Sequence, residues 1–162
     1  MVTEKQIWAA LEEVMDPEIP TISLVDLGIV TSVNLNDGNE VEITLIPTFS
    51  GCPALKVMEE MVAEKVKALG AAQVSVTTNF DIPWTTNRIS EKGRKGLLKH
   101  GLAPPPDDYD GIIELSVLSN IVCPYCQSKN TRLTTPFGPT LCRSMHYCDN
   151  CLQAFEQFKP VG

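Results

Sequence analysis

Four cysteines near the end of the chain have a spacing that suits metal binding. Two residues separate Cys123 from Cys126 and Cys148 from Cys151, and 21 residues lie between the two pairs. One tight turn can direct both sulfurs of such a pair at one ion, and two turns complete the tetrahedral shell of zinc. Four thiolates leave no open coordination position, so we expect a structural zinc. An iron–sulfur cluster on the same sulfurs remains an alternative, because it also takes thiolate ligands.

Two further residues leave the ligand set open. Cys142 and His146 lie just before the second pair, and either could replace one of the four cysteines. The simpler interpretation makes Cys142 a small buried thiol and His146 an exposed or hydrogen-bonded side chain. A thiol reductase that uses one C-x-x-C pair is another alternative, and it requires those two cysteines to be free of metal.

A different chemistry is indicated at Cys52. Pro53 suits the first turn of a helix, which would put Cys52 at or near the N-cap, where unpaired amides lower the pKa of a thiol. Such a thiolate could bind a metal, accept a cluster or act as a nucleophile, whereas the alternative is an inert buried thiol. Asp16 and Glu18 lie in a proline-bounded loop and could either bond to backbone amides or offer oxygen ligands.

The elements that would position these residues form a small α/β sandwich, with helices covering a sheet of mixed direction. Apolar residues at steps of three and four predict helices over residues 4–15, 53–69 and 88–100. Alternating apolar and polar residues predict strands over residues 29–35, 41–46 and 74–79. Residues 36–39 supply a hairpin turn in which Gly38 tolerates a positive φ. In the second helix, Leu55 and Leu69 would begin and end the apolar stripe.

Residues 103–111 are rich in proline and aspartate, which indicates a semi-rigid linker. We therefore predict an α/β domain over residues 1–102 and a smaller domain over residues 112–162. In the second domain, the apolar run 112–118 and the two cysteine pairs predict a zinc-ribbon-like β domain, with hairpins around the metal.

The composition is that of a globular protein with a packed core, since 43% of the residues are hydrophobic and 20% are charged. A net charge of −7 disfavours nucleic-acid binding, which depends on Lys and Arg neutralising phosphates. No apolar run reaches the length of a membrane span, and the chain opens without a basic, apolar leader. We therefore expect a cytoplasmic protein without membrane contact, in which disulfides are disfavoured.

Several motifs outside the cysteine pairs resemble those of known families. The first domain resembles the iron–sulfur maturation domain of SufT-type proteins through DPEIP at 16–20, DLGIV at 26–30 and the T-x-x-x-C-P pattern at 48–53. From about Trp8 to Lys159 the chain resembles the PaaD family of phenylacetyl-CoA epoxidase subunits, also called phenylacetate-degradation protein D. The segments that carry this resemblance are PTFSGCPA, WTTNRISEKGRKGL, CPYC, FGPTLC, YCDNC and AFEQFK. Phe49 stands where we expect tyrosine in that family.

The resemblance implies an accessory protein, rather than an enzyme, that helps to mature a metal centre of the phenylacetyl-CoA epoxidase. The implied clients are its iron–sulfur reductase component or its di-iron oxygenase subunit. Carried onto this sequence, the family's maturation cysteine falls at Cys52, with Thr48 and the loop of Asp16 and Glu18 beside it. Cys52 would transiently hold a cluster or iron, in a homodimer or together with a client cysteine, because a cluster normally takes four ligands. A structural subunit that bridges reductase and oxygenase without handling metal is the alternative.

Overall fold

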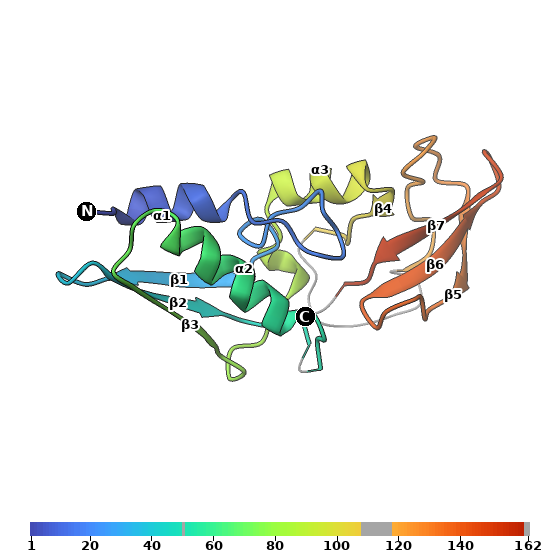
Figure 1. Ribbon diagram of the computed structural model, residues 1–162. Helices are drawn as coiled ribbons and strands as arrows, with labels where there is room; N and C mark the ends of the chain where they lie inside the picture. The colour runs from blue at the N-terminus through green and yellow to red at the C-terminus, as the bar shows by residue number, and fades with distance from the viewer. Residues whose placement is uncertain (50, 108–117, 161–162) are drawn as a thin grey trace. The chain divides into compact units, whose positions relative to one another are not determined.

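A computed structural model describes residues 1–49, 51–107 and 118–160, and the chain folds in it as two units. The first unit contains Met1–Trp84 and Arg88–Gly93, and the second contains Thr85–Asn87 and Arg94–Gly162. Figure 1 shows that each unit has its own sheet. No helix in these described parts of the chain is long and apolar enough to cross a membrane.

A three-stranded sheet forms the centre of the first unit. Its strands are β1 (Val30–Leu35), β2 (Glu40–Leu45) and β3 (Gln73–Thr78), in the order β1-β2-β3. The middle strand β2 runs antiparallel to β1 and parallel to β3, so the sheet is mixed as predicted. Along β2, Val41, Ile43 and Leu45 are almost completely buried, which confirms the alternation read from the sequence.

Helices α1 (Glu4–Leu11) and α2 (Leu55–Lys67) lie on one face of this sheet (Figure 1). Thr3 caps α1 through a capping box with Gln6, which satisfies two backbone donors at the start of the helix. The buried stripe of α2 consists of Met58, Val62 and Val66. These side chains and the apolar residues of β2 make up much of the core of the first unit.

The ends of both helices differ from the prediction. The first helix ends at Leu11 rather than at residue 15, because the chain turns there and Leu24 N–H bonds back to Val14. The second helix begins at Leu55 and ends at Lys67, so Leu69 lies beyond it and is exposed. In the β1–β2 turn the positive φ of 58° belongs to Asn39, not to the glycine at 38.

The third predicted helix divides into a 3₁₀ turn, η1 (Thr86–Arg88), and the helix α3 (Glu91–Lys99). Ser90 separates them, because its hydroxyl accepts a hydrogen bond from Gly93 N–H at 2.9 Å and so caps the start of α3. Gly101, with a φ of 86°, follows the end of α3 as predicted.

The second unit has a four-stranded sheet in the order β4-β7-β6-β5. Strands β5 (Thr131–Thr135), β6 (Arg143–Cys148) and β7 (Gln153–Phe158) form an antiparallel ribbon. The short strand β4 (Leu102–Ala103) pairs parallel with β7, so this sheet is also mixed. The α/β class with a C-terminal ribbon is therefore confirmed.

The linker predicted over residues 103–111 is described only in part. Ala103 is buried and belongs to β4, whereas residues 108–111 lie outside the described residues. Residues 112–117 of the predicted apolar strand also lie outside them. The domain boundary placed there stays a prediction.

Candidate metal centre and cysteine loop

The two cysteine pairs of the ribbon form two turns with the same backbone geometry. In the first, Gln127 N–H bonds to the carbonyl of Cys123 at 2.9 Å, and in the second, Leu152 N–H bonds to that of Cys148 at 2.9 Å. Gln127 and Leu152 have φ values of 63° and 60°, in the left-handed region. This conformation closes each turn and directs its two sulfurs to one side.

The four sulfurs converge as a metal site requires. Sγ of Cys123 lies 3.7 Å from that of Cys151, and Sγ of Cys126 lies 3.5 Å from that of Cys148. All four sulfurs lie within 4.8 Å of one another. A tetrahedral ion with sulfur ligands at about 2.3 Å would space them roughly 3.8 Å apart. The donor set and its spacing therefore fit zinc.

The surroundings of the four cysteines differ from one sulfur to the next. Cys123 and Cys148 are fully buried against Ala103 and Phe155, whereas Cys126 and Cys151 are half-buried. The side-chain amide of Asn150 donates to Cys126 Sγ and, with a backbone hydrogen bond at residue 128, lowers the pKa of that thiol to about 6. Burial raises the pKa of Cys151 to about 12. Of these two half-buried sulfurs, Cys126 therefore offers a thiolate more readily than Cys151.

Among the residues that the structure describes, neither Cys142 nor His146 belongs to the cluster of four cysteines. Sγ of Cys142 lies 3.0 Å from the hydroxyl of Thr140. His146 is fully buried, and its Nε2 lies 2.8 Å from the hydroxyl of Ser144. The ring of His146 stacks on Phe155 at 5.3 Å. His146 is thus hydrogen-bonded, as one interpretation of the sequence held, but it is buried rather than exposed.

The topology of the first unit brings three sequence-distant loops to one edge of its sheet. The start of β1 pairs with the end of β2, as Val30 opposite Leu45, and the end of β3 lies beside the same residue as Thr78. The loop before β1, the loop after β2 and the loop after β3 therefore share this edge. Asp16 and Glu18 lie in the first of these loops, and Thr48 and Cys52 lie in the second.

Cys52 lies outside the helix that was expected to begin beside it. The N-cap of α2 is Ala54, which provides no side-chain hydrogen bond, so Cys52 precedes the cap by two residues. Its N–H bonds to the carbonyl of Phe49 at 3.2 Å, and its carbonyl accepts from Leu55 N–H at 3.3 Å. Cys52 therefore lies near the N-cap of α2, as expected, but in the preceding segment rather than at the cap itself. Cys52 and Thr48 are both half-buried.

The carboxylate of Asp16 is turned onto its own loop. Its Oδ1 accepts hydrogen bonds from Glu18 N–H and Ile19 N–H, each at 2.8 Å, and the residue is 9% exposed. Of the two roles left open for Asp16, the structure shows the one in which it satisfies backbone amides. Glu18 is exposed, and its backbone N–H is the group that bonds to Asp16.

The WTTNRIS segment is attached to the loop before β1, which sequence reasoning missed. Trp84 Nε1 donates to the carbonyl of Leu27 at 2.8 Å, and Ser90 Oγ donates to Asp26 Oδ1 at 2.6 Å. A Cβ on Gly28 would lie 2.5 Å from the Cβ of Arg88, and the φ of Gly28 is 75°. Both motifs were recognised in the sequence as separate segments. That they contact each other depends on the tertiary fold and could not be read from the sequence.

Comparison with known proteins matches the two parts of the chain to two families. Residues 4–77 match the model of an iron–sulfur cluster assembly protein family, and residues 114–159 match that of the PaaD zinc beta ribbon domain. An Escherichia coli protein, named as a putative subunit of 1,2-phenylacetyl-CoA epoxidase, is 34% identical over 157 residues, which cover 96% of this chain and 92% of that protein.

Two further similar proteins match a smaller share of the chain. The Fe-S protein maturation auxiliary factor YitW of Bacillus subtilis is 28% identical over 95 residues, which cover 58% of this chain and 92% of that protein. A crystal structure of a domain of unknown function, DUF59, from Bacillus anthracis aligns with a TM-score of 0.54 at 28% identity. That alignment covers 58% of this chain and 90% of the other.

Proposed function

The chain belongs to the PaaD family of phenylacetyl-CoA epoxidase subunits, and on this premise we propose that it helps to mature a metal centre of that epoxidase. The main support for this proposal is that one chain contains both an assembly-family domain and a cysteine ribbon. A domain of the iron–sulfur assembly family and a ribbon with four converging cysteines both lie within a length that aligns almost throughout with the Escherichia coli relative. Its role is that of an assembly factor rather than a catalyst.

The ribbon cysteines hold a structural zinc in this proposal. Cys123, Cys126, Cys148 and Cys151 fit the ion in number, type and spacing. A zinc ion held by these residues would fix the two turns and would supply no reaction step, because four thiolates would leave it no open coordination position. The ribbon then serves as a folded module through which the chain contacts its client.

Cys52 receives the cargo, an iron–sulfur cluster or iron, and passes it on to the client. Cys52 lies in the segment after β2 that also contains Thr48, and the segment that contains Asp16 and Glu18 leads into β1 at the same end of the sheet. One thiolate cannot satisfy a cluster that normally takes four ligands, so the other ligands come from the client or from a second copy in a homodimer. The proposed client is the iron–sulfur reductase component of the epoxidase, in the cytoplasm.

The test compares Cys52→Ser with Cys142→Ser, a second half-buried cysteine that lies outside both sites. Each variant is produced with the epoxidase components in cells that lack the native protein. Iron and sulfide in the purified reductase, and zinc in this chain, are then measured. We expect Cys52→Ser to lower the iron and sulfide of the reductase while zinc stays at one equivalent, and Cys142→Ser to change neither. Unchanged iron in the Cys52→Ser background would refute the role of Cys52.

A structural subunit is the second candidate, and the name of the Escherichia coli relative as an epoxidase subunit favours it. In this role the chain bridges reductase and oxygenase without handling metal. It would then purify with the active complex in fixed stoichiometry, and Cys52→Ser would leave both the reductase iron and the complex intact. A complex that is fully active after this chain has been removed from it would exclude the bridging role.

A further inference from the structure

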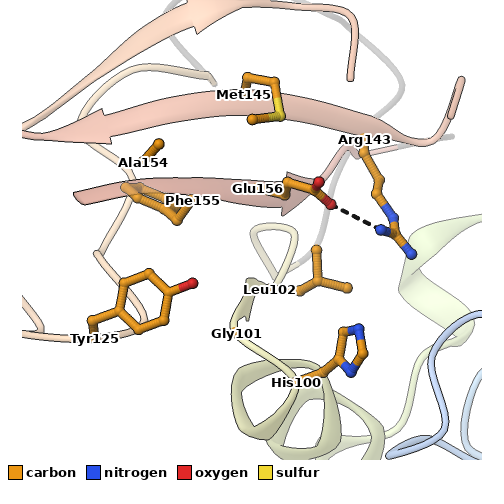
Figure 2. Close-up of a pocket in the computed structure, with 9 residues that line it drawn as sticks. All are labelled: His100, Gly101, Leu102, Tyr125, Arg143, Met145, Ala154, Phe155 and Glu156. Carbon is orange, nitrogen blue, oxygen red and sulfur yellow. Dashed lines mark hydrogen bonds and ion pairs between the residues drawn. The ribbon is translucent and has the colours of Figure 1, made fainter. Parts of the chain in front are cut away.

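The second unit contains a cavity of about 300 Å³ beside its sheet, and the cavity belongs to neither the cysteine cluster nor the Cys52 loop. One wall comes from β6 and β7, and the other comes from the end of α3, from β4 and from Tyr125 in the first cysteine turn (Figure 2). This volume is at the lower end of the range of small-molecule sites. Only a small ligand would fit.

The floor and sides of the cavity combine apolar contact with a few polar groups from separate elements. Leu102, Met145 and Ala154 supply the apolar surface. Figure 2 shows the Arg143 guanidinium and the His100 ring on one side of Leu102, while Tyr125 approaches Gly101 from the other. Few polar groups that converge over apolar walls are the usual composition of a ligand site.

Arg143 is held in place and still has donors to spare. Its Nη1 lies 2.8 Å from Glu156 Oε2, and only 12% of its side chain is exposed. The Nε of Arg143 is buried without a hydrogen-bond partner among the described residues. This atom has almost no accessible surface, so a ligand in the cavity would meet the Nη groups of Arg143 rather than its Nε (Figure 2). The Glu156 carboxylate fixes the orientation of the guanidinium and leaves the rest of it for a ligand.

Tyr125 closes the opposite end of the cavity. A Cβ on Gly101 would lie 3.2 Å from the Tyr125 hydroxyl, so the missing side chain at 101 leaves room for this contact. Because Tyr125 lies between Cys123 and Cys126, the wall that it forms depends on the first cysteine turn. Tyr125 is 53% exposed and offers an aromatic surface at the cavity mouth.

We propose that this cavity binds a small monocarboxylate with an apolar body. The carboxylate lies against the guanidinium of Arg143 and the ring N–H of His100, and the apolar body packs on Leu102 and Met145 beneath Tyr125. A carboxylate matches the forked donors of arginine. A monoanion is favoured over a phosphate dianion, because Glu156 stays beside the guanidinium and repels each added negative charge.

The test titrates the zinc-loaded full chain with benzoate and phenylacetate, with their neutral amides, benzamide and phenylacetamide, and with inorganic phosphate, each in a separate experiment. Chemical-shift changes of the backbone amides in ¹⁵N-labelled protein report binding. We expect saturable shifts at Leu102, Met145 and Ala154 with the acids, and binding of the amides that is weaker by roughly tenfold or more, since they lack the charge-assisted bond to Arg143. Equal binding of acids and amides, tighter binding of inorganic phosphate, or no saturable shift at these residues would each overturn the proposal.

Two variants test the residues. Arg143→Gln should weaken acid binding to the level of the amides, and Tyr125→Phe should weaken it by only a fewfold, because the ring stays in place. Arg132→Gln is the matched control, since Arg132 lies in the same sheet, pairs with Asp149 and does not line the cavity. Affinity for the acids that survives Arg143→Gln unchanged would overturn the proposal. If Arg143→Gln does not fold, the comparison of acids with amides in the unchanged chain still decides it.

Discussion

At the scale of single residues, backbone positions with positive φ hold both candidate sites in shape. Gln127 and Leu152 adopt φ values near 60° although neither is glycine, which costs on the order of 1–2 kcal/mol each. A cation bound by the sulfurs on both sides would offset this cost. Gly28, in contrast, combines positive φ with a close backbone approach, and it fixes the loop before β1 against Arg88.

The substitution Gly28→Ala should therefore destabilise the chain more than Gly70→Ala does. Both glycines have positive φ, 75° and 94°, but a Cβ at position 70 would meet nothing within 4 Å, whereas one at 28 would meet Arg88 at 2.5 Å. We expect a loss of about 1 kcal/mol for Gly70→Ala and about 3 kcal/mol or more for Gly28→Ala. Urea unfolding followed by tryptophan fluorescence measures both, and equal losses would show that the approach of Arg88 relaxes without cost.

At the scale of elements, a polar contact joins the end of α1 to α2. Lys65 Nζ in α2 lies 2.5 Å from Glu13 Oε2, just after α1. The hydrogen bond and the charge of Lys65 hold the pKa of Glu13 below its ordinary value of 4.5. Because the folded-state pKa is lowered, the contact adds stability above the unfolded pKa, and this contribution is lost as pH falls through the folded value. Glu13 is exposed, so the contribution is small.

Lys65→Gln should raise the pKa of the Glu13 carboxyl towards 4.5, because both causes of its lowering are removed. An NMR titration of the side-chain carboxyl carbon between pH 2 and 7 measures the shift. Lys67→Gln is the control, since Lys67 also lies in the last turn of α2, whereas the ion pair of Glu13 is made by Lys65. An unchanged Glu13 titration in Lys65→Gln would mean that the ion pair does not persist in solution.

At the scale of the whole molecule, the two parts of the chain differ in charge and in what holds them together. Residues 1–93 carry 14 acidic and 6 basic side chains, whereas residues 94–162 carry 6 and 7. The acidity that disfavours nucleic-acid binding thus belongs to the first part alone. The first unit has an apolar core between helices and sheet, but the buried cluster around Cys123 and Cys148 is small. A core of that size normally needs additional stabilisation, such as a bound metal ion.

Removal of metal should therefore unfold the ribbon and leave the first unit folded. Under reducing conditions, chelation with EDTA at raised temperature should collapse the backbone amide signals of β5, β6 and β7 in a ¹⁵N spectrum, because the sulfurs are no longer held together. The signals of β1, β2 and β3 should stay dispersed. Zinc added back at one equivalent should restore the ribbon signals.

Two cysteine variants, studied by the same ¹⁵N spectra, provide the control for this experiment. Cys148→Ser should reproduce the chelated spectrum without a chelator, whereas Cys142→Ser should keep the ribbon signals, because Cys142 lies outside the cluster. A ribbon that stays dispersed after metal has been removed would show that its side-chain packing is sufficient by itself.

The sequence by itself determined the features that depend on local pattern. Strict alternation predicted β2, the C-x-x-C spacing predicted the four cysteines that converge, and the motifs predicted the family to which the chain belongs. These predictions succeeded because each was read from a pattern within one strand, one turn or one short motif, although the meeting of the two cysteine turns itself depends on the fold. Helix ends were less well predicted, since a proline or glycine marks where a helix must stop and not where tertiary contacts end it first.

Only the tertiary structure decided which distant residues meet. The antiparallel β1–β2 and parallel β2–β3 pairing places the start of β1 and the ends of β2 and β3 at one end of the sheet, and local periodicity does not contain strand order. The same reason explains why Gly28 meets Arg88, why Ala103 joins the ribbon sheet and why Arg143 faces Tyr125 across a cavity. Each of these contacts depends on long-range packing, in which burial of apolar surface selects one arrangement among many that the local pattern allows.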